Sequence, residues 1–375
     1  MKKLFTSLGL MSGTSGDGVD ASIISSDGKY HYNEILNRYF EYDQKIYKNL
    51  HDLRAKILKF DDLIKNTNEI DILEREITIF HAKITNEILK TTDKKVDFIG
   101  FHGQTIYHNP HERISKQIGD GNLLSQLIKK TVIYNFRQND IKNGGEGAPL
   151  TPIFHKLIVK KKKIEPPVCI LNIGGISNVT VLHEHKNDNF LSRDIGPGNC
   201  LIDEWVKNNT KHKFDKNGEI AKSGKIDELI LNQALDNFEN IFNKKILSFD
   251  IKDFSLGFVR GLNLEDGAAT LTDFTGRIIG EGIYNFLSEA QDKSWKVLVC
   301  GGGRKNITLI NKIKNTIPKN LEIQYIDDYG IDGDYVESQA FAYLSIRSFL
   351  KLPISFPSTT GCKVPSIGGI IVKNF

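Results

Sequence analysis

Residues 4–25 read LFTSLGLMSGTSGDGVDASIIS and contain the clearest indication of the fold. Two apolar runs, Leu4 to Met11 and Val19 to Ser25, flank a loop of small, hydroxylated and acidic residues. Each run has the length and composition of a strand, so the pattern predicts a β-hairpin. A Walker phosphate loop is excluded, because that motif needs a lysine and a following helix, whereas Gly18 is followed by a strand-like run.

The same pattern returns in residues 168–182, VCILNIGGISNVTVL, where two apolar runs flank a loop with glycines, Ser and Asn. This internal echo indicates two related domains, the second beginning near residue 145. A length of 375 residues, above the usual size of one domain, agrees with that interpretation.

Hydrophobic periodicity predicts the remaining elements. It indicates a third antiparallel strand over residues 30–42 and a short buried strand over 96–100 that ends in FHGQT. Helices are expected at about 45–58, 62–91, 200–208, 226–241, 266–290 and 335–350, and a strand at 297–300 leads into Gly301 to Gly303 and another helix.

Composition narrows the class of protein. With 39% hydrophobic and 26% charged residues, the chain resembles a globular enzyme. Lys plus Arg exceed Asp plus Glu by 50 − 46 = 4, so the net charge indicates neither nucleic acid nor a membrane surface as partner. No run of eighteen apolar residues is present, and we expect neither a membrane span nor a signal peptide. Four scattered cysteines favour a reducing cytoplasm.

Three glycine-bearing loops each follow a predicted strand: Ser12 to Gly18, Gly174 to Asn178, and Gly301 to Gly303. Glycines let backbone N–H groups approach an anion, and Ser or Thr hydroxyls add donors without bulk. One such loop means little, but three in two domains predict a nucleotide site.

Two carboxylates, Asp17 and Asp20, lie beside the first loop. A triphosphate binds as its Mg²⁺ complex, and Mg²⁺ favours one or two carboxylates acting directly or through water. Asp17 is therefore the expected Mg²⁺ ligand. The alternative is that Asp17-Gly18 only forms the hairpin turn.

Asp194 precedes a rigid Gly-Pro-Gly turn, residues 196–198, ahead of a predicted helix. This arrangement is typical of a side chain fixed at a site, so Asp194 is a candidate general base. Helix capping is the alternative, although Asn199 lies closer to the start of the helix and would cap it better.

Polar residues over 135–140, followed by glycines at 144–147, predict a recognition loop for a sugar or a carboxylate. The fork of Arg137 suits a planar carboxylate, whereas an Arg137–Asp140 surface pair is the alternative. Among the histidines, His183 and His185 lack further ligands at zinc spacing, and His102 at a predicted strand end is the better site candidate.

Taken together, these stretches resemble the anhydro-N-acetylmuramic acid kinases of bacterial cell-wall recycling. The resemblance runs from residue 8 to about 370. It departs from the family at Gly16, where a bulkier apolar residue is usual, at Ile195, where Thr is usual, and at residues 247–254. The motifs that carry it are GLMSGTSGDGVDA, FHGQTIYHNP, QIGDGNLLSQ, NFRQNDIKNGGEGAPLTPIFH, LNIGGISNVT, DIGPGNCLIDEW, CGGGRKN and VESQAFAYL.

The resemblance implies an α/β, two-domain actin-like ATPase fold, ribonuclease H-like, with an interdomain active-site cleft. Domain I would comprise residues 1–140 plus about 340–375, and domain II residues 141–339. The implied cofactors are ATP and Mg²⁺, the implied partner is a small anhydro amino sugar, and a homodimer is implied by the family only.

The resemblance also assigns roles to residues. The phosphates of ATP would lie on Gly13, Thr14, Ser15, Gly16, Asp17, Gly18, Asp20, Asn172, Gly174 and Gly175. The adenosine would lie near Gly301, Gly302, Gly303 and Asn306. The sugar would contact His102, Gln104, Arg137, Asp140, Gly196, Pro197 and Asn199, with Arg137 facing its lactyl carboxylate.

The implied reaction opens the 1,6-anhydro ring with water and phosphorylates O6, with Asp194 as the base. Glu337 would assist as a second acid–base group, or it is only a first-turn carboxylate favoured by the helix dipole. Two alternatives are an ordinary N-acetylhexosamine kinase and a nucleotide-gated binding protein that switches conformation without a sugar.

Overall fold

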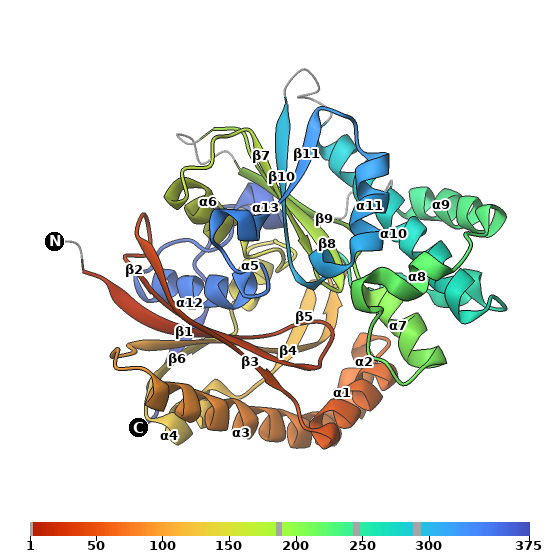
Figure 1. The fold of residues 1–375 in the computed structure, drawn as a ribbon. Helices are drawn as coiled ribbons and strands as arrows, with labels where there is room; N and C mark the ends of the chain where they lie inside the picture. Colours follow the sequence, from red (N-terminus) through yellow and green to blue (C-terminus); the bar gives the residue numbers. More distant parts are fainter. Residues whose placement is uncertain (1–2, 185–189, 243–247, 288–293) are drawn as a thin grey trace. The chain divides into compact units, whose positions relative to one another are not determined.

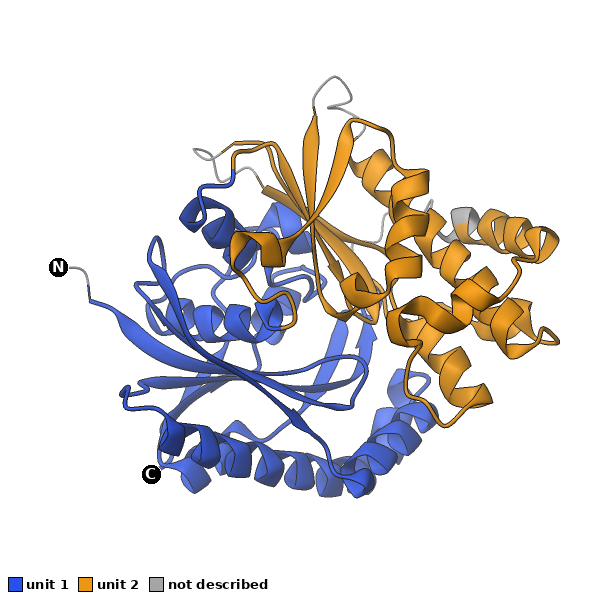
Figure 2. Cartoon of the chain, viewed as in Figure 1, with its two compact units in different colours: residues 1–164, 335–375 blue, residues 165–334 orange. Residues whose placement is uncertain are grey.

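The computed structural model describes residues 3–184, 190–242, 248–287 and 294–375. The chain divides into two compact units, residues 1–164 with 335–375 and residues 165–334 (Figure 2). The first limit lies beyond the expected residue 140, because the helix of residues 152–161 packs within unit 1. Its Phe154 lies between Tyr32 and Tyr343, with ring centroids 5.2 and 5.6 Å apart.

Unit 1 contains a seven-stranded sheet in the order β12-β6-β4-β1-β2-β3, with β5 paired to β4 (Figure 1). The strands are β1 Phe5–Ser12, β2 Gly18–Ser26, β3 Tyr32–Glu41, β4 Phe98–Asn109, β5 Ile114–Ile118, β6 Thr131–Tyr134 and β12 Ile370–Val372. The helices are α1 Gln44–Lys56, α2 Phe60–Lys65, α3 Thr67–Thr91, α4 Gly121–Ile128, α5 Gln138–Lys142, α6 Pro152–Lys161, α12 Val336–Phe349 and α13 Pro357–Thr360.

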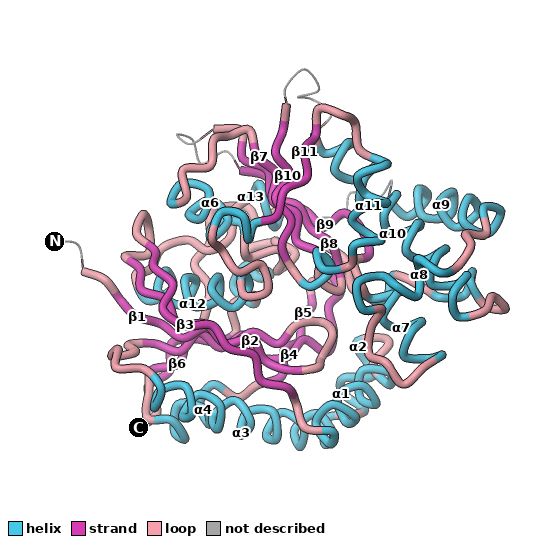
Figure 3. Tube along the Cα trace, in the orientation of Figure 1, coloured by secondary structure: helices cyan, strands magenta, loops and turns pink. Residues whose placement is uncertain are grey.

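Unit 2 contains a five-stranded sheet in the order β11-β10-β7-β8-β9, with helices gathered on one side of it (Figure 3). The strands are β7 Val168–Ile173, β8 Ile176–Leu182, β9 Phe190–Pro197, β10 Trp295–Cys300 and β11 Leu321–Tyr325. The α-helices are α7 Cys200–Asn209, α8 Glu219–Ser223, α9 Glu228–Phe242, α10 Leu264–Phe286 and α11 Ile307–Thr316. The 3₁₀ helices are η1 Lys216–Gly218, η2 Ile251–Asp253, η3 Leu256–Val259, η5 Gly302–Lys305 and η6 Ile326–Tyr329.

The two sheets share one topology. In unit 1, β1, β2 and β3 form an antiparallel meander, and β4 and β6 add in parallel on the other side of β1. In unit 2, β7, β8 and β9 form the same meander, and β10 and β11 add in parallel beside β7. The echo in the sequence is therefore a repeated sheet, and the expected α/β fold with two related domains is confirmed.

Strand β1 shows how the core of unit 1 is built. Successive side chains of a strand face opposite sides, and Leu8 and Leu10 belong to the buried apolar core that α1 and α3 complete. On the other side, Gly9 lies against α12, where a Cβ atom would stand 2.0 Å from the Ser338 carbonyl oxygen. Ser7 adds a 2.6 Å hydrogen bond to Ser345 of α12. The sheet is thus covered on both faces (Figure 1).

Differences from the expected elements have local causes. The helix expected over 62–91 is two helices that meet at Asn66, whose φ and ψ of −102° and 18° are not helical. The strand expected to end at residue 100 continues to Asn109, because β5 pairs with its second half. His102 and Gln104 therefore lie within a strand.

Candidate active site

The first glycine loop joins β1 to β2 by a tight turn. The Gly16 N–H donates to the Gly13 carbonyl at 3.2 Å, so the turn covers residues 13–16 and precedes Asp17. Gly16 has a φ of +63°, which disfavours the bulkier residue usual in the family at this position. The hydroxyl of Ser15 donates to Asp17, and the Tyr42 N–H donates to the Asp17 carbonyl at 2.9 Å.

Three side chains from other elements hold this loop. Gln104 donates its amide N–H to the Gly13 carbonyl at 3.0 Å, and Arg54 of α1 donates to the Thr14 carbonyl at 2.6 Å. The hydroxyl groups of Ser12 and Tyr42 lie 2.8 Å apart. Neither Arg54 nor Tyr42 was expected at the site, because no local motif in the sequence marks them.

The second glycine loop, between β7 and β8, is held by backbone groups. The Asn199 N–H donates to the Gly174 carbonyl at 2.8 Å, and the N–H groups of Gly198 and Cys200 donate to the Gly175 carbonyl at 2.9 and 3.2 Å. Backbone N–H groups at the start of α7 therefore hold this loop in place. Asn199 occupies the N-cap position of α7 without a side-chain cap hydrogen bond.

Asp194 lies in β9 and is only 6% exposed. It pairs with Asn178 of β8, and directly opposed side chains share one face of the sheet. The Phe249 N–H donates to Asp194 Oδ2 at 2.8 Å. Residues 248–254, where the chain departs from the family pattern, thus contribute a direct contact to the candidate base. Asn178 was expected within the second glycine loop, with no role of its own.

The third glycine loop follows β10 and is fixed by Arg304, whose side chain is 8% exposed. Arg304 pairs with Asp327 through two hydrogen bonds of 2.8 and 2.9 Å and with Asp334 at 2.5 Å, and it donates to the Gly301 carbonyl at 3.1 Å. Burial alone would raise the pKa of both carboxyls, but the hydrogen bonds from Arg304 lower the pKa of each below 3.8.

The sugar-recognition candidates of unit 1 form one network. Arg137 donates to His102 Nε2 and to the Gly147 carbonyl, both at 3.0 Å. His102 Nδ1 lies 2.8 Å from the Gly103 carbonyl and must donate to it, which leaves Nε2 as the acceptor for Arg137. Burial, and then the charge of Arg137, hold the pKa of His102 well below its usual value, so the ring is neutral.

Asp140 supports the same loop from beneath. Its carboxylate accepts from the Gly147 N–H at 2.8 Å and from the Thr360 hydroxyl at 2.7 Å, and it is 1% exposed. Asp140 and Arg137 therefore hold opposite ends of Gly147. Arg137 and Asp140 therefore do not form the surface ion pair that was the alternative prediction for them.

The other predicted residues are placed as follows. Asn306 caps α11 by accepting from the Leu309 N–H at 3.0 Å. Asn172 is the penultimate residue of β7 and is 5% exposed. Gly196 lies against Ile278 of α10, where a Cβ atom would come within 2.4 Å. Glu337 lies in the first turn of α12. Asp20 lies in β2, Pro197 ends β9, and Gly302 and Gly303 lie in η5.

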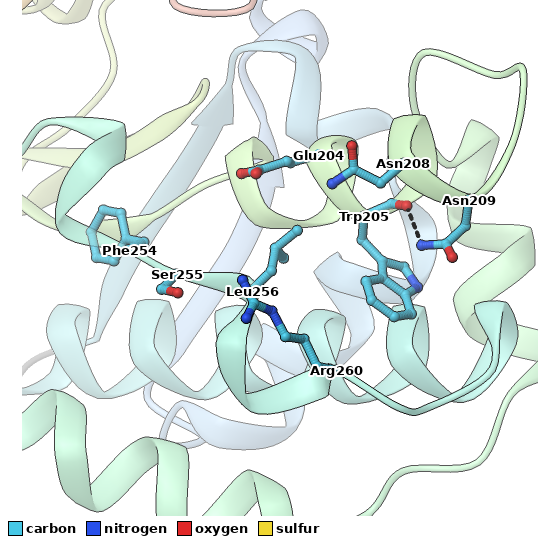
Figure 4. Close-up of a pocket in the computed structure, with 8 residues that line it drawn as sticks. All are labelled: Glu204, Trp205, Asn208, Asn209, Phe254, Ser255, Leu256 and Arg260. Carbon is cyan, nitrogen blue, oxygen red and sulfur yellow. Dashed lines mark hydrogen bonds between the residues drawn. The ribbon is translucent and has the colours of Figure 1, made fainter. Parts of the chain in front are cut away.

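A cavity of about 350 Å³ lies in unit 2 between α7 and the segment of residues 254–260 (Figure 4). Glu204 and Asn208 of α7 face it from one side, and Ser255 and Arg260 line the other. None of its lining residues was predicted for the site.

The fit of a divalent cation can be tested on Asp17. Within the described ranges, no cluster of three or more His, Cys, Asp or Glu side chains is placed to hold a metal. Mg²⁺ carried by a nucleotide needs only one or two protein carboxylates, because phosphates and water supply the other ligands. Asp17, half-buried on the first loop, fits that requirement.

Of the two histidines considered for zinc, His183 packs its ring against that of Trp295, with ring centroids 5.3 Å apart. His185 lies outside the described residues.

Two further observations bear on the chain as a whole. Of the helices in the described ranges, none combines the length and the apolarity that crossing a membrane requires. The four cysteines are free, and burial raises the pKa of Cys169 and Cys200 to about 12.

Comparison with known proteins gives a consistent match. The family model described as anhydro-N-acetylmuramic acid kinase matches residues 5–374. The anhydro-N-acetylmuramic acid kinase of Pelagibacter ubique (strain HTCC1062) is 59% identical over 375 residues, covering 100% of both chains. That of Zymomonas mobilis subsp. mobilis (strain ATCC 31821 / ZM4 / CP4) is 36% identical over 371 residues, covering 97% of this chain and 98% of the relative.

Two solved structures are also similar, each at 12% identity. The activator of the 2-hydroxyisocaproyl-CoA dehydratase from Clostridium difficile with bound ADPNP matches with a TM-score of 0.40 over 92% of this chain and 97% of that chain. Component A of the Acidaminococcus fermentans (R)-2-hydroxyglutaryl-CoA dehydratase matches with a TM-score of 0.43 over 92% and 98%.

The Arg304 network predicts a pH-dependent stability. Because the pKa values of Asp327 and Asp334 are lowered on folding, their contribution is present above pH 3.8 and is lost as the pH falls through the lowered values. We expect Arg304→Met to lower the free energy of unfolding by about 2 kcal/mol at pH 7 and to flatten its decline below pH 4. Urea unfolding at several pH values measures both effects.

The matched control is Arg277→Met, which removes a more exposed arginine from the same unit. It should cost less than Arg304→Met, because Lys312 still pairs with Asp273 when Arg277 is removed. An Arg304→Met variant as stable as the wild type at pH 7 would show that the network does not stabilise the third loop.

Proposed function

Because the chain belongs to the anhydro-N-acetylmuramic acid kinase family, and is an enzyme of that kind, we propose the following reaction for it. It uses ATP and water to convert 1,6-anhydro-N-acetylmuramic acid into N-acetylmuramic acid 6-phosphate and ADP, in peptidoglycan recycling. The observation that best supports this chemistry is Asp194, a nearly buried carboxylate oriented by the Phe249 N–H in the unit that also carries the second glycine loop.

The substrate dictates the order of bonds. In the anhydro sugar O6 is part of an internal acetal, so no free hydroxyl is available to an ordinary kinase. Asp194 accepts a proton from water as the water oxygen bonds to C1, and the C1–O6 bond breaks. O6 then bonds to the γ-phosphorus, whose bond to the bridging oxygen breaks and releases ADP. General-base assistance of this kind contributes about 10²–10⁴-fold to the rate.

The glycine loops would bind the triphosphate through their N–H groups, and Asp17 would hold Mg²⁺. Bound Mg²⁺ supplies positive charge that offsets the charge developing on the phosphoryl oxygens. Gly301 to Gly303, fixed by Arg304, would face the adenosine. Glu337, in the first turn of α12, would serve as a second acid–base group.

On the sugar side, Arg137 would pair with the lactyl carboxylate. A neutral His102 that accepts from Arg137 leaves the positive charge of the guanidinium for the ligand. Asp140 would act through the loop that it holds, since its carboxylate accepts from Gly147 and from Thr360, which belong to the same unit. Gly196, Pro197 and Asn199 would complete the sugar contacts.

We assign the reaction to the cytoplasm, where ATP is available and the buried cysteines persist as thiols. The family also implies a homodimer. Neither assignment is needed for the chemistry above.

The first test is the mass of the product formed from ATP, Mg²⁺ and 1,6-anhydro-N-acetylmuramic acid in ¹⁸O-labelled water. We expect a product that has gained one phosphoryl group and one labelled oxygen at C1, because ring opening consumes a water molecule. A phosphorylated sugar with an intact anhydro ring, or phosphorylation of N-acetylhexosamines alone, would contradict the proposal. Omission of Mg²⁺ in the presence of a chelator should abolish turnover.

The role of Asp194 predicts a separation of binding from turnover. Asp194→Asn keeps the size of the side chain and should lower kcat by about 10²–10⁴-fold, because an amide cannot accept the proton from water. Calorimetry should find ATP binding unchanged. The control Asp236→Asn removes an exposed carboxylate from the same unit and should leave both quantities unaltered. Full turnover in Asp194→Asn would exclude it as the base.

The role of Arg137 predicts a change in selectivity. Arg137→Ala should weaken binding of the anhydro sugar about 10- to 100-fold, because a charged hydrogen-bond pair is lost. It should bind the analogue without the lactyl group about as well as the wild type does. Arg38→Ala, which removes an exposed partner of Glu87, is the control for loss of an arginine. Equal weakening for both sugars would assign Arg137 to structure instead.

A further inference from the structure

The carbonyl groups of the first glycine loop are held by two long side chains that come from elsewhere in unit 1. The Gly13 carbonyl accepts from Gln104 Nε2 at 3.0 Å, and the Thr14 carbonyl accepts from Arg54 Nη1 at 2.6 Å. Gln104 is separated from Gly13 by 91 residues, and Arg54 from Thr14 by 40. Both contacts therefore depend on the completed fold.

Holding these carbonyls also sets the direction of the neighbouring N–H groups. A trans peptide unit is planar, so its C=O and its N–H point in opposite directions. Gln104 fixes the peptide that carries the Thr14 N–H, and Arg54 fixes the peptide that carries the Ser15 N–H. A loop that binds phosphate must present N–H groups and keep carbonyl oxygens away, since a carbonyl dipole repels an anion.

The second glycine loop solves the same problem with backbone groups. There the Gly174 and Gly175 carbonyls accept from the N–H groups at the start of α7. No side chain is needed, because α7 begins directly beneath the loop. The first loop is not followed directly by a helix, since α1 begins only at Gln44. The Thr14 carbonyl instead accepts from the side chain of Arg54, near the C-terminal end of α1.

We infer that Gln104 and Arg54 are positioning residues that orient the first loop for the phosphates of ATP. The inference rests on the proposed function of that loop. It changes the role of Gln104, which the family resemblance assigns to the sugar. It also gives a role to Arg54, which no motif marks.

The geometry of Gln104 favours the loop over the sugar. Its side chain is 0% exposed, and Nε2 lies near two carbonyl oxygens, those of Gly13 at 3.0 Å and Thr105 at 3.5 Å. Two carbonyl neighbours fix the amide with its nitrogen toward the loop. The other amide atom, Oε1, is buried without a hydrogen-bond partner among the described residues. The amide N–H groups are thus committed to the carbonyls of Gly13 and Thr105, and only Oε1 is left to accept from a ligand.

The test separates ATP binding from sugar binding in the full-length protein. We compare Gln104→Met, which removes the donor, with Arg54→Met and with Arg54→Lys, which keeps a donor at shorter reach. Calorimetry measures the Kd for ATP, and steady-state kinetics give the KM for each substrate. We expect the Kd for ATP to rise about fivefold in Gln104→Met and about tenfold or more in Arg54→Met, with partial recovery in Arg54→Lys. The KM for the sugar should stay within about twofold.

Gln126→Met, an exposed glutamine of α4, and Arg38→Met are the matched controls and should change neither quantity. A raised KM for the sugar with an unchanged Kd for ATP would return Gln104 to the sugar and overturn the inference. Unchanged values for both substrates in Gln104→Met and Arg54→Lys would overturn it as well, even if Arg54→Met does not fold. Wild-type protein that binds no ATP would instead remove the proposed function, and the inference with it.

Discussion

The close approach of α12 to β1 and β4 is the constraint on which unit 1 depends. A Cβ atom at Gly9 would lie 2.0 Å from the Ser338 carbonyl oxygen, and one at Gly100 would lie 2.4 Å from that of Phe341. Serine pairs close the same interface, since the hydroxyls of Ser22 and Ser338 lie 2.7 Å apart. Apolar burial alone would not require this spacing. The glycines and serines together bring a late segment of the chain back onto the first sheet.

The packing of α12 on the sheet also fixes the position of Glu337. Glu337 directly precedes Ser338, which is bonded to β2, so the first turn of α12 cannot shift along the sheet without breaking that contact. The same sheet continues into the first glycine loop, which is the connection between β1 and β2. A carboxylate and the first glycine loop are therefore held on the same unit, which suits the roles proposed for both.

The sequence was sufficient for the parts of the molecule that depend on local pattern. Apolar runs on either side of the glycine loops predicted both hairpins, and the repeat of that pattern predicted two related domains. The boundary near residue 164 was missed, because α6 is retained in unit 1 by the rings of Tyr32 and Tyr343, far from it in sequence. Likewise, Arg54 and Phe249 reach their partners across 40 and 55 residues, and nothing in their own neighbourhoods indicates such contacts.

The two glycine loops have similar sequences but are oriented by different kinds of hydrogen bond. Both present small residues after a strand, yet one is oriented by the backbone of α7 and the other by the side chains of Gln104 and Arg54. A backbone clamp survives most substitutions, because every residue except proline supplies an N–H. A side-chain clamp survives only while those two residue types persist. The first loop is thus the more specific feature of this chain, although its glycines alone would suggest that the two loops are equivalent.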